Sequence, residues 1–269
     1  MTLSGIWAAA VTPVHADLQP DAERAVIYYG ELLDSGCSGI NLLGTTGEAM
    51  SFSVQQRVGL MQAITASGLP RERFMTGTGA ASLDDAVSLN VAAHACGFAA
   101  SLVMPPFFYR DAGDDGVVAW FDALLSRTAG RQLPILLYNF PKMSGTTFGV
   151  ELTGTLIERF GSIIAGIKDS SNDQQLQRDL IAAFPQLRVF PGSEGYLTHA
   201  RGYGAAGCIS GTVALWPALA RDVWNGNDAS SAELTRLRDS VGHPLIANVR
   251  ARIAQARKDD AWLRAVPPL

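Results

Sequence analysis

Three stretches of the chain carry residue types that chemistry on a carbonyl group would need. Lys168 follows an apolar run at 163–167, and Tyr138 follows another at 135–137. The third stretch, Gly44-Thr45-Thr46-Gly47-Glu48, combines two glycines with two hydroxyls. An amine can form a Schiff base with a carbonyl, and a phenol can transfer protons. A loop with accessible N–H groups and hydroxyls can hold a small anion. Together these groups suit a 2-oxo acid, whose carboxylate the loop would hold and whose ketone the lysine would attack.

Lys168 has a simpler alternative explanation that its position alone leaves open. The chain has only three lysines, at 142, 168 and 258, against eighteen arginines. Lysine is almost never fully buried without a partner, so a lysine that ends a buried strand needs a reason. In the simpler alternative the strand ends there, and Lys168 points to water or pairs with Asp169.

The elements that would position these residues form a repeating pattern. Short apolar runs that predict buried strands alternate with helix-period segments, and Ser53 with Gln56 has the pattern of a capping box. The predicted strands are 6–11, 40–43, 74–78, 99–104, 135–139, 163–167, 188–191 and 207–210. The predicted helices are 21–35, one from 53, 82–96, 113–128, 149–160, 172–183, 196–203, 216–225, and a tail at 229–260 broken near 242–244.

Eight strand and helix units in one unbroken chain predict an α/β fold, the (β/α)₈ TIM barrel with additional C-terminal helices. Strands that alternate with helices indicate a parallel sheet, and the chain length of 269 residues fits a single barrel. No GxGxxG motif follows the first strand, which weakens a dinucleotide-binding reading. We expect a catalytic barrel over residues 1–226 and a helical extension over 227–269 packed on it.

Barrel active sites lie where the strands end. The predicted site therefore has Lys168 and Tyr138 as catalytic residues, with Thr45, Thr46 and Gly47 binding substrate. Further substrate-binding candidates stand at the ends of the last two strands; they are Gly192, Glu194, Ile209 and Ser210, with Thr212 as a weaker one.

Composition excludes several classes of function. The net charge is −4, which gives no electrostatic case for nucleic acid binding. No run of 18 apolar residues occurs, so we expect no membrane span. Three scattered cysteines form neither a disulfide framework nor a metal-ligand spacing, which fits a cytoplasmic protein. No HxxxH or CxxC pattern exists, and we expect no metal site.

The three motifs together resemble the dihydrodipicolinate synthase / N-acetylneuraminate lyase family of pyruvate-dependent class I aldolases. The likeness spans essentially the whole chain, and its motifs are Gly44-Thr45-Thr46-Gly47-Glu48, Tyr138-Asn139-x-Pro141 and Gly166-Ile167-Lys168-Asp169. The resemblance implies that Lys168 forms the imine, that Tyr138 relays protons, and that Thr45 and Thr46 bind the pyruvoyl carboxylate. It also implies a homo-oligomer, tetramer or dimer, which acts on a small 2-oxo acid without metal or organic cofactor.

Departures from the family pattern bear on the substrate. True dihydrodipicolinate synthases carry an arginine where this chain has Met143, and a tyrosine where it has Phe108, although Tyr109 is adjacent. Such a tyrosine reaches a neighbouring subunit's site. Sialic acid lyases have an acidic pair where this chain has only Glu194.

The resemblance is therefore nearer to 2-keto-3-deoxy-sugar-acid aldolases, and the predicted reaction cleaves or forms such an acid from pyruvate and an aldehyde. The alternatives are a 2-keto-3-deoxy acid dehydratase, a dihydrodipicolinate synthase, and a non-catalytic barrel that binds small acids.

Overall fold

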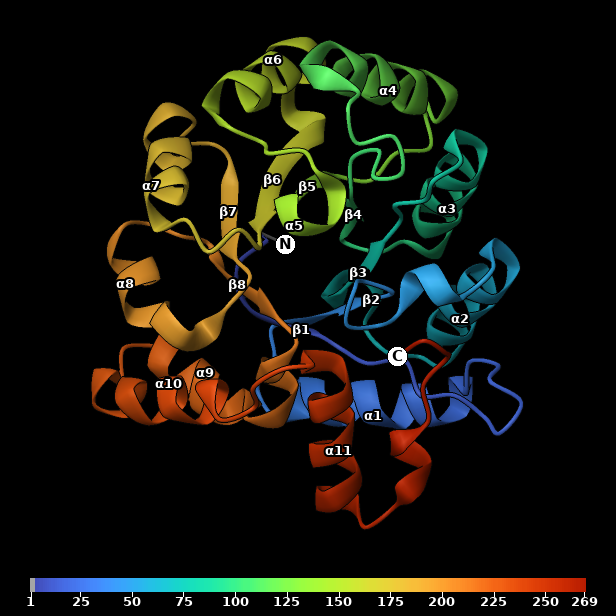
Figure 1. Cartoon of the computed structure of the whole chain (residues 1–269), viewed down its shortest axis with the longest axis vertical. Coiled ribbons are helices and arrows are strands. Elements are labelled where there is room, and N and C mark those ends of the chain that lie inside the picture. The colour runs from blue at the N-terminus through green and yellow to red at the C-terminus, as the bar shows by residue number, and fades with distance from the viewer. Residues whose placement is uncertain (1–2) are drawn as a thin grey trace.

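Eight parallel strands form the centre of the molecule (Figure 1). The structure is a computed structural model that describes residues 3–269. The strands are β1 (Gly5–Ala9), β2 (Gly39–Leu42), β3 (Phe74–Gly77), β4 (Ala100–Val103), β5 (Ile135–Asn139), β6 (Ile164–Asp169), β7 (Arg188–Pro191) and β8 (Gly207–Ser210). Their order is β7-β6-β5-β4-β3-β2-β1-β8. The two end strands meet through a hydrogen bond of 2.8 Å from Ala206 N to Val189 O, so the barrel is nearly closed.

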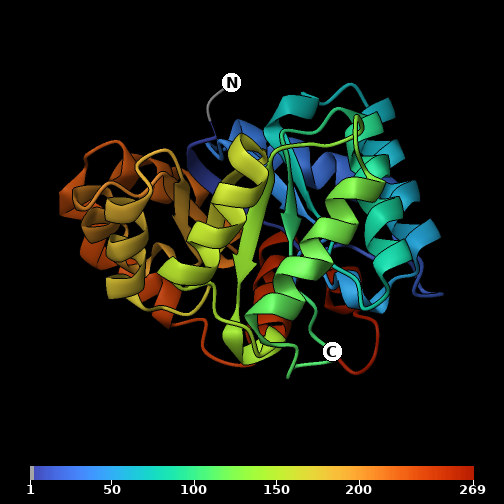
Figure 2. The ribbon, with the colours of Figure 1, turned by 90° about the horizontal axis from the view of Figure 1, so that it is seen from above.

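Helices surround the strands and cover their outer side (Figures 1 and 2). They are α1 (Ala22–Asp34), α2 (Val54–Ala66), α3 (Leu83–Cys96), α4 (Gly113–Arg127), α5 (Pro141–Ser144), α6 (Val150–Phe160), α7 (Gln174–Ala183), α8 (Leu197–Gly202), α9 (Pro217–Trp224), α10 (Ser231–Asp239) and α11 (Leu245–Arg257). The (β/α)₈ prediction is confirmed, including the capping box at Ser53 and Gln56.

The sequence prediction missed α5, a single helical turn directly after β5. A four-residue helix has no room for the apolar periodicity by which helices are recognised. Pro141 at its first position and Gly145 with φ +78° after its end fix its two limits. In Figure 1 this turn lies over the barrel, at the ends of the strands.

The apolar core has two layers because strand side chains alternate between the two faces of the sheet. The larger cluster fills the space between the strands and the helices. The smaller one lies within the barrel and contains Trp7, Met75, Leu136, Tyr138 and Phe190. Both faces of each strand are therefore buried, which explains why the strands read as continuous apolar runs.

The C-terminal helices pack onto the last elements of the barrel. Helix α10 contacts η4 (Glu194–Tyr196), and α11 contacts η5 (Thr212–Leu215) and η7 (Asp260–Leu263). The tail then runs to the end of the molecule toward which the strands point (Figure 2). No helix within residues 3–269 is long and apolar enough to cross a membrane. The predicted division at residue 226 stays a prediction.

Candidate active site

Lys168 and Tyr138 lie side by side within the barrel. The register of β5 and β6 pairs Tyr138 with Lys168, and both side chains are about 5% exposed or less. Lys168 Nζ lies 4.6 Å from the centroid of the Tyr138 ring. The alternative in which Lys168 points to water does not hold, because the amine is buried against a phenol.

The loop after β2 meets this pair. Thr45 Oγ1 lies 3.2 Å from the Tyr138 hydroxyl, within hydrogen-bond distance. Leu43 and Glu48, on either side of the loop's threonines, have left-handed backbone with φ of +53° and +56°. Such backbone costs free energy in residues other than glycine, so surrounding contacts must hold the loop. One of them is the 2.7 Å hydrogen bond from Thr12 Oγ1 to Gly47 O.

Thr46 is buried under the loop that follows β8. A Cβ atom added to Gly211 would lie 2.8 Å from Thr46 Oγ1, so only glycine permits this close approach. Gly211 was not a candidate in the sequence, because its importance depends on a contact between distant loops.

A buried carboxylate, Asp169, fixes the ends of β5 and β6. Its Oδ1 accepts hydrogen bonds from Asn139 Nδ2 at 2.7 Å and Ser171 N at 3.1 Å, and its Oδ2 accepts one from Gln177 Nε2 at 2.5 Å. Asn139 Oδ1 in turn accepts a bond from Phe148 N at 3.0 Å. Asn139 and Asp169 belong to the quoted motifs, but they had no catalytic or binding role in the sequence prediction, in which Asp169 appeared only as an ion-pair partner of Lys168. Here they hold Tyr138 and Lys168 in place.

Glu48, the last residue of the threonine loop, binds the C-terminal helix. Arg250 of α11 donates from Nε to Glu48 Oε1 at 2.6 Å and from Nη2 to Thr12 O at 2.7 Å. Glu48 Oε2 accepts from Val266 N at 3.4 Å. Burial raises the pKa of Glu48, and Arg250 opposes that rise. Neither residue was a candidate in the sequence, because 202 positions separate them.

The candidates on the last two strands form a separate buried cluster. Glu194 is 1% exposed and accepts a 2.5 Å hydrogen bond from Thr212, whose Oγ1 lies 3.2 Å from Ser210 Oγ. Glu194 Oε2 has no hydrogen-bond partner in the described part of the chain. Gly192 N donates to Asp169 O at 2.7 Å. Ile209 belongs to the barrel-interior cluster that includes Tyr138.

A cavity of about 280 Å³ opens beside Tyr138 and Thr45. We call it the Tyr138 cavity. Its walls are largely apolar and come from the strand ends, from α5, and from the C-terminal segment; they include Leu43, Met104, Phe107, Met143, Ile246 and Leu269. Within residues 3–269, the residues that line this cavity do not include Lys168, Glu194 or Ser210.

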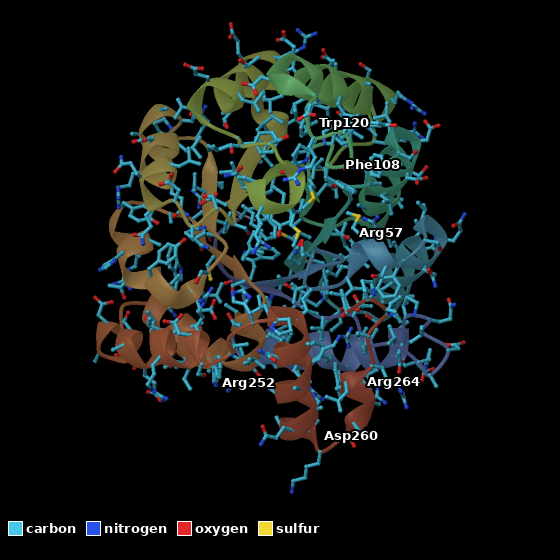
Figure 3. The ribbon with its side chains drawn as sticks, in the orientation of Figure 1. Arg57, Phe108, Trp120, Arg252, Asp260 and Arg264 are labelled. Carbon is cyan, nitrogen blue, oxygen red and sulfur yellow. The ribbon has the colours of Figure 1, made fainter. Side chains whose placement is uncertain are left out.

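Phe108 and Tyr109 lie on the loop between β4 and α4, where Figure 3 labels Phe108. Both side chains are more than 70% exposed, and their ring centroids are 5.3 Å apart. The neighbouring Phe107, which the sequence analysis did not select, lines the Tyr138 cavity instead.

The structure also bears on metal binding. Within residues 3–269, no three or more His, Cys, Asp or Glu side chains are grouped so that they could hold a metal ion.

Comparison with known proteins agrees with this architecture. An uncharacterized DapA-like lyase of Chloroflexus aurantiacus is 36% identical over 244 residues, 88% of this chain and 81% of the relative. The crystal structure of dihydrodipicolinate synthase from Agrobacterium tumefaciens matches with a TM-score of 0.91 and 28% identity, covering 98% of this chain and 92% of the other.

A variant of Sulfolobus solfataricus 2-keto-3-deoxygluconate aldolase matches with a TM-score of 0.85, covering 98% of this chain and 89% of the other. Its sequence identity is 18%, so that likeness concerns the fold alone. The sequence profile of the dihydrodipicolinate synthetase family matches residues 2–255. The resemblance seen in the three motifs is confirmed, and this chain belongs to the dihydrodipicolinate synthetase family.

Proposed function

We propose that the protein is a Schiff-base lyase. It cleaves a 4-hydroxy-2-oxo acid to pyruvate and an aldehyde, or forms the acid from these two compounds. The observation that carries the proposal is the buried contact between Lys168 Nζ and the Tyr138 ring, at 4.6 Å, with Thr45 on the Tyr138 hydroxyl. A 2-keto-3-deoxy sugar acid, the substrate predicted from the sequence, is one member of this class.

The reaction begins at the amine. Lys168 Nζ attacks the C2 ketone, water leaves, and a protonated imine forms. Thr45 and Thr46 hold the C1 carboxylate with their hydroxyls and the loop's N–H groups, which orients the substrate for attack. No metal or organic cofactor is required in this scheme, because the imine itself accepts the electron pair.

Bond cleavage follows at C3 and C4. Tyr138, whose own proton has gone to the hydroxyl that left as water, takes the proton of the C4 hydroxyl, the C3–C4 bond breaks, and the aldehyde leaves. The electron pair of that bond passes to the imine and produces an enamine. Protonation of the enamine at C3 and hydrolysis of the imine release pyruvate and restore the Lys168 amine. A hydrogen bond to Thr45 would keep the Tyr138 hydroxyl directed toward the substrate.

A second candidate has one observation in its favour. Dihydrodipicolinate synthases use an arginine where this chain has Met143. Here another arginine, Arg110, packs against Gly145, which lies two residues after Met143. That guanidinium could serve a second carboxylate. Condensation of pyruvate with aspartate semialdehyde would reveal this activity.

The experiment is a panel of 4-hydroxy-2-oxo acids, both hydroxylated and apolar, assayed for pyruvate release. Release of pyruvate with the matching aldehyde is expected. A product that keeps all its carbon atoms but has lost water would identify a dehydratase instead, and binding of the acids without any turnover would identify a non-catalytic barrel.

A further inference from the structure

The Tyr138 cavity is the space into which the proposed reaction would place the part of the substrate beyond C4. With C2 bonded to Lys168 Nζ and the carboxylate on Thr45 and Thr46, the C4 hydroxyl must reach Tyr138. Tyr138 and Thr45 both line the cavity. The chemistry of the cavity wall should therefore match the aldehyde half of the substrate.

The polar side chains of the wall are already in use. Glu48 is bound by Arg250 and Val266 N, and Thr45 lies within hydrogen-bond distance of Tyr138. Among the lining residues that the structure describes, only Ser51 has a hydroxyl that no other protein group engages. A chain of several hydroxyls would find too few partners here.

Three backbone carbonyls of the wall are also engaged by other protein groups. Gly77 O and Gly79 O both accept from Arg57 Nη2, at 2.8 and 3.0 Å, and Gly44 O accepts from Ala49 N at 3.3 Å. Figure 3 labels Arg57, the buried side chain of α2 that makes the first two bonds. Hydroxyl groups that leave water without gaining replacement hydrogen bonds are disfavoured, and a wall of this kind prefers apolar groups.

We propose that the aldehyde half of the substrate is apolar: an aryl or alkyl aldehyde, so that the 4-hydroxy-2-oxo acid carries a hydrocarbon group at C4. This inference rests on the proposed function and specifies its substrate class. The size agrees, since an apolar cavity of about 150 Å³ holds a benzene ring, and the Tyr138 cavity measures about 280 Å³. Ser51 can accept one polar substituent on such a group.

The condensation balances without any further reactant. The pyruvate enamine on Lys168 attacks the aldehyde carbon with C3, and the C3–C4 bond forms. The aldehyde oxygen takes the Tyr138 proton and becomes the C4 hydroxyl. Hydrolysis of the imine then releases the acid.

The test compares aldehydes of matched skeleton in condensation with pyruvate. Butanal and erythrose each have four carbons, and benzaldehyde provides an aromatic ring. We expect kcat/KM for butanal and benzaldehyde to exceed that for erythrose by about tenfold or more, the range that one pocket contact can supply. Equal or higher kcat/KM for erythrose would overturn the inference.

Substitutions in the wall of the Tyr138 cavity test whether the preference for apolar aldehydes arises there. Ile246→Asn places an amide in the cavity wall and should lower the ratio of kcat/KM values, butanal over erythrose, by about threefold or more. Met143→Gln makes the same test at a position that is half exposed. The matched control is Ile27→Asn on the exposed face of α1, which should leave the ratio unchanged. A ratio that stays constant in both cavity variants would contradict the inference.

Trapping of a pyruvate adduct by borohydride distinguishes a failure of the apolar-substrate inference from a failure of the proposed lyase function. An adduct together with a preference for erythrose would refute the apolar substrate and leave the Schiff-base lyase standing. Absence of any adduct would refute the proposed function itself.

Discussion

The Asn139 amide donates a 2.7 Å hydrogen bond to the Asp169 carboxylate across the β5–β6 ladder, one residue beyond the pair formed by Tyr138 and Lys168. Both residues are fully buried. The bond fixes the relative position of the two strand ends at the place where the amine and the phenol meet.

Loss of this bond should lower both stability and turnover. In Asn139→Ala, Asp169 loses a donor and Phe148 N loses its acceptor. We expect the free energy of unfolding to fall by about 1–3 kcal/mol, the cost of buried groups left unpaired. The value of kcat should fall by about tenfold because the Lys168–Tyr138 geometry loosens. Urea unfolding and steady-state kinetics measure the two effects. The control is Asn225→Ala at an exposed position, and equal behaviour of the two variants would count against a positioning role.

The ion pair between Glu48 and Arg250 should affect substrate binding from a distance. Arg250→Met leaves a buried carboxylate unpaired at the end of the threonine loop, so we expect a loss of about 3–5 kcal/mol in the free energy of unfolding and a higher KM for pyruvate. The double variant Glu48→Gln/Arg250→Met should recover part of the stability, because no buried charge remains.

Arg264→Met is the control for that pair. Arg264 is an exposed arginine of the segment after α11, labelled in Figure 3. An unchanged KM for pyruvate in Arg250→Met would show that the loop does not depend on the C-terminal helix.

Tyr138→Phe should separate imine formation from bond cleavage. The ring that covers Lys168 Nζ remains, but the proton relay is lost, so kcat should fall by about 10²–10⁴-fold. Adduct formation with pyruvate should persist. Thr45→Val tests the partner of the hydroxyl and should reduce kcat less. A Tyr138→Phe variant with the wild-type kcat would remove Tyr138 from the mechanism.

Two of the buried thiols should be inert in the folded protein. Burial raises the pKa of Cys37 to about 12 and that of Cys208 well above its usual value. At pH 8, iodoacetamide should modify neither until urea unfolds the chain. Since the folded Cys37 thiol ionises at a higher pH than the unfolded one, its contribution to stability is complete below about pH 9 and declines from there toward about pH 12. Rapid modification of native Cys37 would contradict this.

The fold could be predicted from local pattern because each strand is buried on both faces and the longer helices bury apolar residues against the strands. The same pattern placed Tyr138 and Lys168 on neighbouring strands, and their pairing follows from the parallel register. The association of Thr45 with Tyr138 followed from their shared place at strand ends.

The contacts that hold the site could not be predicted, because they join residues far apart in the chain. Arg250 meets Glu48 and Gly211 covers Thr46 only once the barrel closes and α11 packs on it. The same holds for the Tyr138 cavity, whose wall includes Leu43, Ile246 and Leu269. The position of Glu194, an acid with no arginine or lysine partner among its described contacts, also required the fold.

The Schiff-base role of Lys168 is tested most directly by reduction with borohydride in the presence of pyruvate, followed by mass analysis of the peptides. We expect one pyruvyl adduct, on the peptide that contains Lys168, and no adduct in Lys168→Ala. Lys142→Ala, a change to one of the two other lysines, should retain the adduct. No adduct in the wild-type protein, or one that survives Lys168→Ala, would contradict the assignment of Lys168 as the Schiff-base residue.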